Sequence, residues 1–185
     1  MTDFRSAVDQ IVEELRTALY SATDTYPLRQ DILHAQRIFV AGKGRSGLQM
    51  RAFAMRLTHL GMPVHVVDEV TTPAITENDL LLIGSGSGRT PSLVQYAEKA
   101  RALNARLAVI TIDEASPIAQ YADCILCLPA PTPKLEGTQL TGSILPMGSL
   151  FEQALGLLLD IVVLQLMTDL NVNAKQMFAR HANLE

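Results

Sequence analysis

The stretch IFVAGKGRSG, residues 38–47, places a glycine-rich turn directly after a short apolar run. The stretch LLLIGSGSGRT, residues 80–90, repeats this design and adds three hydroxyl groups to its turn. A strand that ends in such a turn and leads into a helix presents free backbone N–H groups at the positive end of the helix dipole. Two such turns on neighbouring strands predict an anion site, suited above all to phosphate, at the carboxyl edge of a parallel sheet.

The polar side chains of both turns fit the same ligand. Each hydroxyl can donate a hydrogen bond to a phosphate oxygen. Serine and threonine also favour turns and helix starts for structural reasons, but three hydroxyls interleaved with three glycines exceed what a turn requires. The predicted ligand-binding residues are Arg45, Ser46, Ser85, Gly86, Ser87, Gly88, Thr90 and Gln139. Of these, Gln139 lies in a later loop and is expected to close over the ligand.

Outside the turns, short apolar runs alternate with segments of helical periodicity. Strands are expected at residues 37–41, 64–67, 80–83, 107–112 and 124–128. Helices are expected at residues 3–24, 28–34, 46–60, 92–103, 116–120, 147–169 and 173–181. Nearly all-apolar strands that alternate with helices are typical of a parallel sheet covered on both faces. We therefore predict one α/β domain over residues 1–185, a flavodoxin-like, doubly wound α/β/α sandwich with a five-stranded parallel sheet.

Composition limits the classes of partner and compartment. The chain carries a formal net charge of −4, which argues against nucleic acid as a general partner. The polar N-terminus lacks the pattern of a secretory signal. The most apolar stretch, residues 154–167, is shorter than the roughly 20 residues needed to cross a bilayer. We expect a cytoplasmic protein in which this stretch is a core or interface helix.

The two cysteines form a C-x-x-C pattern, Cys124 to Cys127, inside an apolar run. Positions i and i+3 of a strand point to opposite faces of the sheet. The pattern therefore predicts two buried free thiols in a reducing compartment rather than a redox or metal site.

A dinucleotide site is the alternative interpretation of the first turn. Residues 42–47 satisfy G-x-G-x-x-G, and Asp68 follows about twenty residues later. The chain has no room for a separate substrate domain, however, and Lys43 and Arg45 put bulk and charge where that fingerprint keeps small or apolar residues. The second turn has no counterpart in the dinucleotide pattern, so we favour a small phosphorylated ligand.

A long segment without regular pattern, residues 129–145, precedes the helix expected at residues 147–169. Such a segment in a compact domain is more often a functional loop than a neutral one. The helix opens with GSLFE, residues 148–152, and with the two turns this motif resembles the sugar isomerase (SIS) domain family over nearly the whole chain. The resemblance is closest to the 6-phospho-3-hexuloisomerase branch, on residues 44–57, TTPAI at 71–75 and HANLE at 181–185.

Members of that branch interconvert D-arabino-3-hexulose 6-phosphate and fructose 6-phosphate, after hexulose-phosphate synthase in the ribulose monophosphate route of formaldehyde fixation. The resemblance thus implies an isomerase that works as a homotetramer without metal or cofactor. Two residues depart from the branch: Lys43 stands where a small residue is commoner, and Arg89 where an acidic one is usual. Both add positive charge near the expected phosphate, which favours either tighter binding or a slightly different ligand.

Such an isomerisation needs a base beside the carbonyl and a group that stabilises the enediolate. Glu152 is the predicted base. Its spacing alone favours a structural role, in which the glutamate only interacts with the helix dipole. The match to the GSLFE motif favours the catalytic role instead. His181 is the second predicted catalytic residue, as an acid–base group or to open a cyclic substrate, and a neighbouring subunit is a possible source of it. Arg45 is expected near sugar hydroxyls or the enediolate, or else on the surface.

The remaining candidates have weaker assignments. Asp68 and Glu69 are expected either near sugar hydroxyls or in structural roles, and His59 and His65 in structural roles. Two other functions stay open at this point: an isomerase of the same family that acts on a five- or seven-carbon sugar phosphate, and a non-catalytic sugar-phosphate sensor, which would have no need for Glu152.

Overall fold

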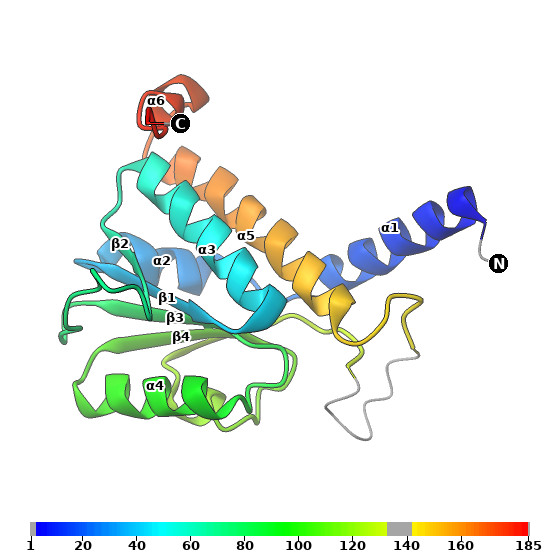
Figure 1. Cartoon of the computed structure of the whole chain (residues 1–185), viewed down its shortest axis with the longest axis horizontal. Coiled ribbons are helices and arrows are strands. Elements are labelled where there is room, and N and C mark those ends of the chain that lie inside the picture. Colours follow the sequence, from blue (N-terminus) through cyan, green and yellow to red (C-terminus); the bar gives the residue numbers. More distant parts are fainter. Residues whose placement is uncertain (1–2, 133–141, 185) are drawn as a thin grey trace.

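The computed structural model describes residues 3–132 and 142–184, in which five parallel strands form one sheet (Figure 1). The strands are β1 (Ile38–Gly42), β2 (Val64–Val66), β3 (Leu80–Gly84), β4 (Arg106–Thr111) and β5 (Cys124–Cys127). Their order in the sheet is β2-β1-β3-β4-β5, which is the predicted flavodoxin-like order.

Helices cover both faces of this sheet (Figure 1). They are α1 (Phe4–Tyr20), α2 (Tyr26–His34), α3 (Gly44–Leu60), α4 (Pro91–Ala102), the 3₁₀ helix η1 (Ala119–Tyr121), α5 (Ser149–Asp169) and α6 (Ala174–Phe178). α3 and α5 lie side by side on one face, and α4 lies on the other (Figure 1). The first part of α1 projects beyond the sandwich, as the N-terminal end of the chain in Figure 1 shows.

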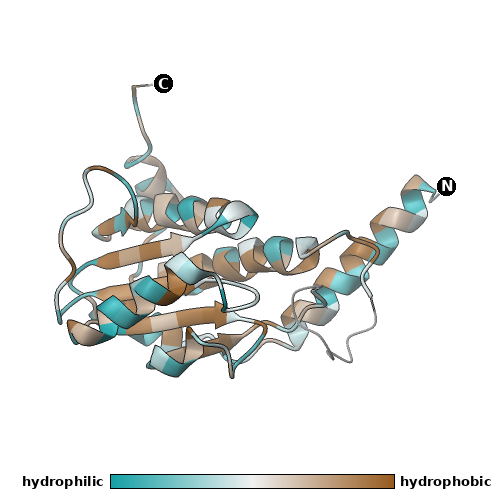
Figure 2. Cartoon of the chain, turned by 60° about the horizontal axis from the view of Figure 1, so that its bottom comes forward, coloured by the Kyte–Doolittle hydropathy of each residue, from teal (hydrophilic) through white to brown (hydrophobic). Residues whose placement is uncertain are grey.

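Alternating strand residues divide the core into two layers. Ile38 and Val40 of β1 pack toward the side of α3 and α5, and Phe39 and Ala41 pack toward α4. All four are buried. Because neither face of the strand meets water, every position is apolar, as expected for a parallel sheet between helices. Figure 2 shows the strands as mostly hydrophobic and the helices with alternating hydropathy.

The strand order places the two glycine-rich turns together. β1 and β3 are neighbours in parallel register, from Ile38 opposite Leu80 to Gly42 opposite Gly84. The chain winds toward β2 on one side of this pair and toward β4 and β5 on the other, so the pair is the point where the winding reverses. Ligands of open α/β sheets bind at this point, beyond the carboxyl ends of the strands.

The structure changes the limits of several expected elements. The short helix expected at residues 116–120 is the 3₁₀ helix η1, which begins at Ala119, because Ser116 uses its hydroxyl to accept the N–H of Ala119. The helix expected at 173–181 ends at Phe178. The helix expected at 3–24 ends at Tyr20.

The apolar helix α5 is longer than its most apolar stretch. With 21 residues it is long and apolar enough to cross a membrane by length and composition alone, so the sequence-based argument from length was wrong. Half of the most apolar 18-residue part of this helix is buried inside the protein, as in a core helix. Its packing against α3 and α1 confirms the expectation of a core helix.

Candidate active site

A cavity of about 420 Å³ opens at the carboxyl ends of β1 and β3. Its wall comes from both glycine-rich turns, from Thr132, and from the segment that leads into α5. This volume lies within the ordinary range for small-molecule sites. Five of the predicted ligand-binding side chains line the cavity, namely Arg45, Ser46, Ser85, Ser87 and Thr90, together with the glycine Gly86.

The first turn is narrow because its glycines let the backbone approach itself. A Cβ on Gly47 would lie 2.7 Å from the carbonyl oxygen of Gly42, a contact that real side chains do not make. Gly44 has φ +57°, in the left-handed region that glycine adopts without strain. α3 begins at Gly44, so the positive end of its dipole points into the cavity, and the hydroxyl of Ser46 is buried there.

The second turn brings its hydroxyl-bearing residues to the same wall. Ser85 and Ser87 are buried, and Thr90 is the N-cap of α4 with no capping bond from its own side chain. Gly88, with φ +59°, does not line the cavity; its carbonyl accepts the N–H of Ile118, and it packs against Ser116. Its place is therefore behind the turn, where it fixes the turn's shape.

Glu152 faces this cavity from the first turn of α5. Its Oε2 lies 3.3 Å from Nε of Arg45, and Nη1 of Arg45 donates to Oγ of Ser149 at 2.8 Å. The arginine comes from α3 and both partners come from α5, so this cluster joins the two helices at the mouth of the site. A carboxylate and a guanidinium beside a hydroxyl-rich anion site can serve as a base and as a stabiliser of developing negative charge.

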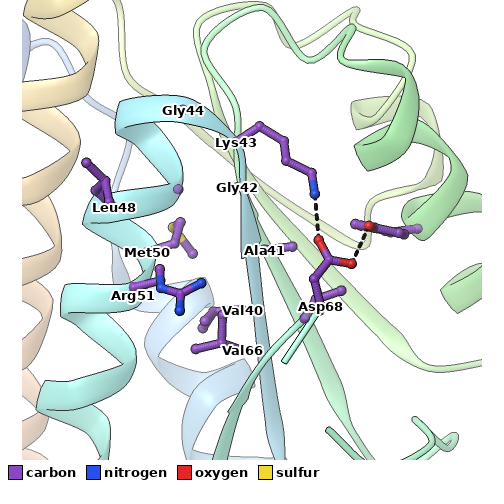
Figure 3. A pocket seen from close by; sticks show the side chains of 13 residues that line it. Val40, Ala41, Gly42, Lys43, Gly44, Leu48, Met50, Arg51, Val66 and Asp68 are labelled. Atoms are coloured by element: carbon purple, nitrogen blue, oxygen red, sulfur yellow. Dashed lines mark hydrogen bonds and ion pairs between the residues drawn. The ribbon is translucent and has the colours of Figure 1, made fainter. Parts of the chain in front are cut away.

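Lys43, in the first turn, lines both this cavity and a neighbouring one, and its amino group is held by Asp68. Figure 3 shows its side chain toward Asp68, which also accepts a hydrogen bond from Tyr96. The Nζ–Oδ2 distance is 2.5 Å and the Tyr96 Oη–Oδ1 distance is 2.6 Å. The hydrogen bond to Asp68 raises the pKa of Lys43, and the bonds from Lys43 and Tyr96 lower the pKa of Asp68. These groups line a second cavity, of about 240 Å³, between β1 and β2.

Arg89, the second residue that adds positive charge relative to the branch pattern, is paired as well. Arg89 forms an ion pair with Asp113, which follows β4, at 2.8 Å. Glu69 is paired with Arg51 of α3. Each residue that departs from the branch pattern therefore has a carboxylate partner, which reduces its net effect on the charge around the expected phosphate.

His181 lies at the other end of the sandwich. Its ring stacks on His59, near the end of α3, with ring centroids 5.2 Å apart. Since an α-helix rises 1.5 Å per residue, the path from Arg45 to His59 along α3 is about 20 Å. His181 is therefore remote from Glu152 of its own chain. Burial, with smaller contributions from Arg56 and His181, lowers the pKa of His59, and His65 packs on Phe39.

Three further observations complete the comparison with the sequence. Gln139 lies outside the described residues. Cys124 is a buried free thiol whose pKa burial raises to about 11, which opposes thiolate chemistry. Within residues 3–132 and 142–184, no group of three or more His, Cys, Asp or Glu side chains is arranged to hold a metal ion.

Sequence reasoning missed several residues of the cavity wall, among them Thr132, Met147 and Ser149. Ser149 lies within the GSLFE motif, so its position next to Glu152 was the available signal. Thr132 and Met147 reach the cavity only because the chain returns to the sheet edge there, which no local pattern encodes.

Known proteins resemble this chain closely. A family model described as the SIS domain matches residues 31–156. The chain is 44% identical over 180 residues to the 3-hexulose-6-phosphate isomerase of Bacillus subtilis (strain 168), covering 96% of this chain and 97% of that protein. It is also 44% identical over 158 residues to the 3-hexulose-6-phosphate isomerase of Mycobacterium gastri, covering 85% and 78%.

A solved structure supports the same relation. It is the crystal structure of a Methanococcus jannaschii protein for which a molecular function of 3-hexulose-6-phosphate isomerase was inferred. The TM-score is 0.83 at 33% identity, and the match covers 96% of this chain and 98% of the other.

Proposed function

The chain belongs to the SIS domain family, and we propose that it interconverts D-arabino-3-hexulose 6-phosphate and D-fructose 6-phosphate through an enediolate. The observation that carries this proposal is the meeting of Glu152 with the hydroxyl-rich second turn in one cavity. Relatives named 3-hexulose-6-phosphate isomerase, similar over nearly the whole chain, support this choice of substrate over five- or seven-carbon sugar phosphates.

The second turn is the proposed phosphate site. Ser85, Ser87 and Thr90 surround the N-terminal end of α4, where hydroxyl groups and backbone N–H groups can donate to phosphate oxygens. Ser46 and the start of α3 line the same cavity and would meet the sugar. A phosphate at one end and Glu152 at the other fix the sugar between them.

Glu152 is the proposed base. In the direction from fructose 6-phosphate, its carboxylate removes the proton from C3, beside the C2 carbonyl, and the resulting 2,3-enediolate is protonated at C2. This yields the 3-ketose and needs no redox partner, because the carbonyl moves by proton transfer alone. Arg45, 3.3 Å from the carboxylate, places its positive charge where the enediolate oxygens develop negative charge.

His181 would act in the site of a neighbouring subunit. The distance along α3 separates it from its own Glu152, whereas a symmetric assembly can bring one chain's C-terminal end to another chain's cavity. Two exposed apolar stripes support assembly into the expected tetramer, Phe4, Val8 and Val12 on α1 and Leu157, Ile161 and Leu164 on α5. We further propose a cytoplasmic location and a functional link to a hexulose-phosphate synthase.

Proton NMR in deuterated water tests the reaction directly. The purified protein is incubated with fructose 6-phosphate, and we expect a 3-ketohexose phosphate to appear with deuterium at C2. Loss of the C3 proton signal of fructose 6-phosphate would accompany it. Tight binding of the sugar without turnover would instead support a sensor. The absence of both binding and turnover would exclude fructose 6-phosphate as the substrate.

A further inference from the structure

The segment that leads into α5 is tied to α1 by one carboxylate. Glu14 accepts a hydrogen bond from the hydroxyl of Ser143 and another from the N–H of Ile144, the latter at 3.0 Å. The Ser143 hydroxyl in turn accepts the N–H of Leu145 at 2.9 Å. Figure 1 shows this segment next to α1, beyond the edge of the sheet. Glu14 therefore ties the chain down just before it enters the active-site wall.

The same segment forms part of the cavity. Met147 and Gly148 line it, four and five residues after Ser143. Met147 has φ +60°, a left-handed conformation that costs a side-chain-bearing residue free energy and persists only where the surroundings hold it. The N–H of Ser149 donates to the carbonyl of Pro146 at 3.2 Å, which closes the turn into α5.

Glu152 is held in place by the packing of α5, independently of the segment before it. Leu150, Phe151 and Ala154, on either side of it in α5, are buried in the core. Loss of the tie at Glu14 would therefore free the wall at Met147 and Gly148 without moving the helix that carries the base. Such a change alters how well the ligand fits the cavity more than it alters proton transfer.

We infer that Glu14 is a positioning residue that holds the Met147–Gly148 wall of the sugar phosphate cavity through Ser143 and Ile144. This inference rests on the proposed function, because the cavity is the one assigned to the substrate. It gives α1 a part in the active site as well as in the proposed assembly.

The kinetic test compares Glu14→Ala, Glu14→Gln and the control Glu13→Gln. Glu13 pairs with Arg16 on the exposed side of the same helix. We expect Glu14→Ala to raise KM for fructose 6-phosphate about three- to tenfold, the effect of losing roughly one net hydrogen bond, with kcat within about twofold. Glu14→Gln should lie between wild type and Glu14→Ala, because its amide oxygen still accepts the Ile144 N–H. The control should match wild type.

Hydrogen–deuterium exchange supplies a readout that does not depend on turnover. Amides of residues 142–149 should exchange faster in Glu14→Ala, and amides of β1 and β3 should not change. An unchanged KM, or a lower Tm with both KM and kcat preserved, would overturn the inference. If wild type does not convert the sugar, the proposed function fails, and the exchange rates alone then decide whether Glu14 holds the segment.

Discussion

Glu152 is the residue on which the proposed chemistry depends most directly. Replacing it with Gln keeps its size but removes the basic oxygen, so we expect kcat to fall by about 10²–10⁴-fold, the usual contribution of a positioned base. Calorimetry should find the affinity for fructose 6-phosphate within a few-fold of wild type, since the hydroxyls of the second turn are untouched. Glu98→Gln, on the exposed side of α4, is the control. Turnover close to wild type in Glu152→Gln would contradict the mechanism.

Arg45 joins α3 to Glu152 and Ser149 of α5 through two different nitrogens of its guanidinium group. Lysine offers one compact ammonium group and cannot reproduce this geometry. We expect Arg45→Lys to lower kcat/KM by about tenfold, a loss on the scale of one charge-assisted contact. The control is Arg101→Lys, whose ion pair with Asp123 is equally exposed but lies far from the cavity. Equal losses in both variants would argue against a specific role for Arg45.

At the residue scale, the sequence allowed prediction only of side chains that converge because they are close in the chain. The hydroxyls of residues 85–90 are close in sequence, so their convergence needed only a strand, a turn and a helix start. The contact of Arg45 with Ser149 joins residues more than a hundred positions apart, and the tie from Glu14 to Ser143 is longer still. Such contacts depend on how helices pack, which periodicity alone does not specify.

At the scale of elements, close packing of α3 and α5 over the end of β3 depends on glycine. A Cβ on Gly84 would lie 2.6 Å from Sδ of Met50 and 3.1 Å from Leu155, and both side chains are fully buried. Gly84→Ala should therefore destabilise the protein by about 1–3 kcal/mol, as overpacking does. In Gly156→Ala the methyl group meets only the amide end of Gln49, which is half-buried and can turn away. Urea unfolding should show a clear loss for the first variant and little change for the second.

Element types were predictable because burial imposes a period. The central positions of the buried strands β1, β3 and β4 are apolar without interruption, and each helix repeats its apolar residues at helical spacing. The limits were less predictable where a side chain competes with the backbone, as Ser116 does before η1. The helix over α5 was expected at nearly its observed limits, but its apolar part was underestimated because Asp160 and Gln165 interrupt it, which a helix accommodates on its less buried side.

At the scale of the whole molecule, an ion pair at the amino edge of the sheet makes stability depend on pH. Asp79 is buried and accepts two hydrogen bonds from Arg37, at 3.0 and 2.7 Å, and two from Thr76. Burial alone would raise the pKa of Asp79, but these bonds outweigh it and the pKa is lowered. The carboxylate therefore stabilises the fold above its unfolded pKa of about 4, and this contribution is lost as pH falls through the lower folded value.

Asp79→Asn should consequently cost about 2 kcal/mol at neutral pH, less than for a fully buried pair because Arg37 is partly exposed. The difference from wild type should shrink below about pH 4 as the wild-type carboxyl becomes protonated. Urea titrations between pH 7 and pH 3 measure it. A difference that stays constant over this range would contradict the assigned role.

The catalytic role proposed for His181 would make catalysis a property of the assembly. His181 stacks on His59 at the far end of α3 from Glu152, so a site that uses both residues must take them from two chains. His181→Ala and Glu152→Gln should each be impaired alone, and co-expressed oligomers that contain both chains should regain activity, because some of their sites then hold both native side chains. A chain that carries both substitutions, mixed with Glu152→Gln, is the control and should stay inactive, since no site contains Glu152. If mixed oligomers verified by mass spectrometry stay inactive, or if His181→Ala alone is fully active, His181 does not act across an interface.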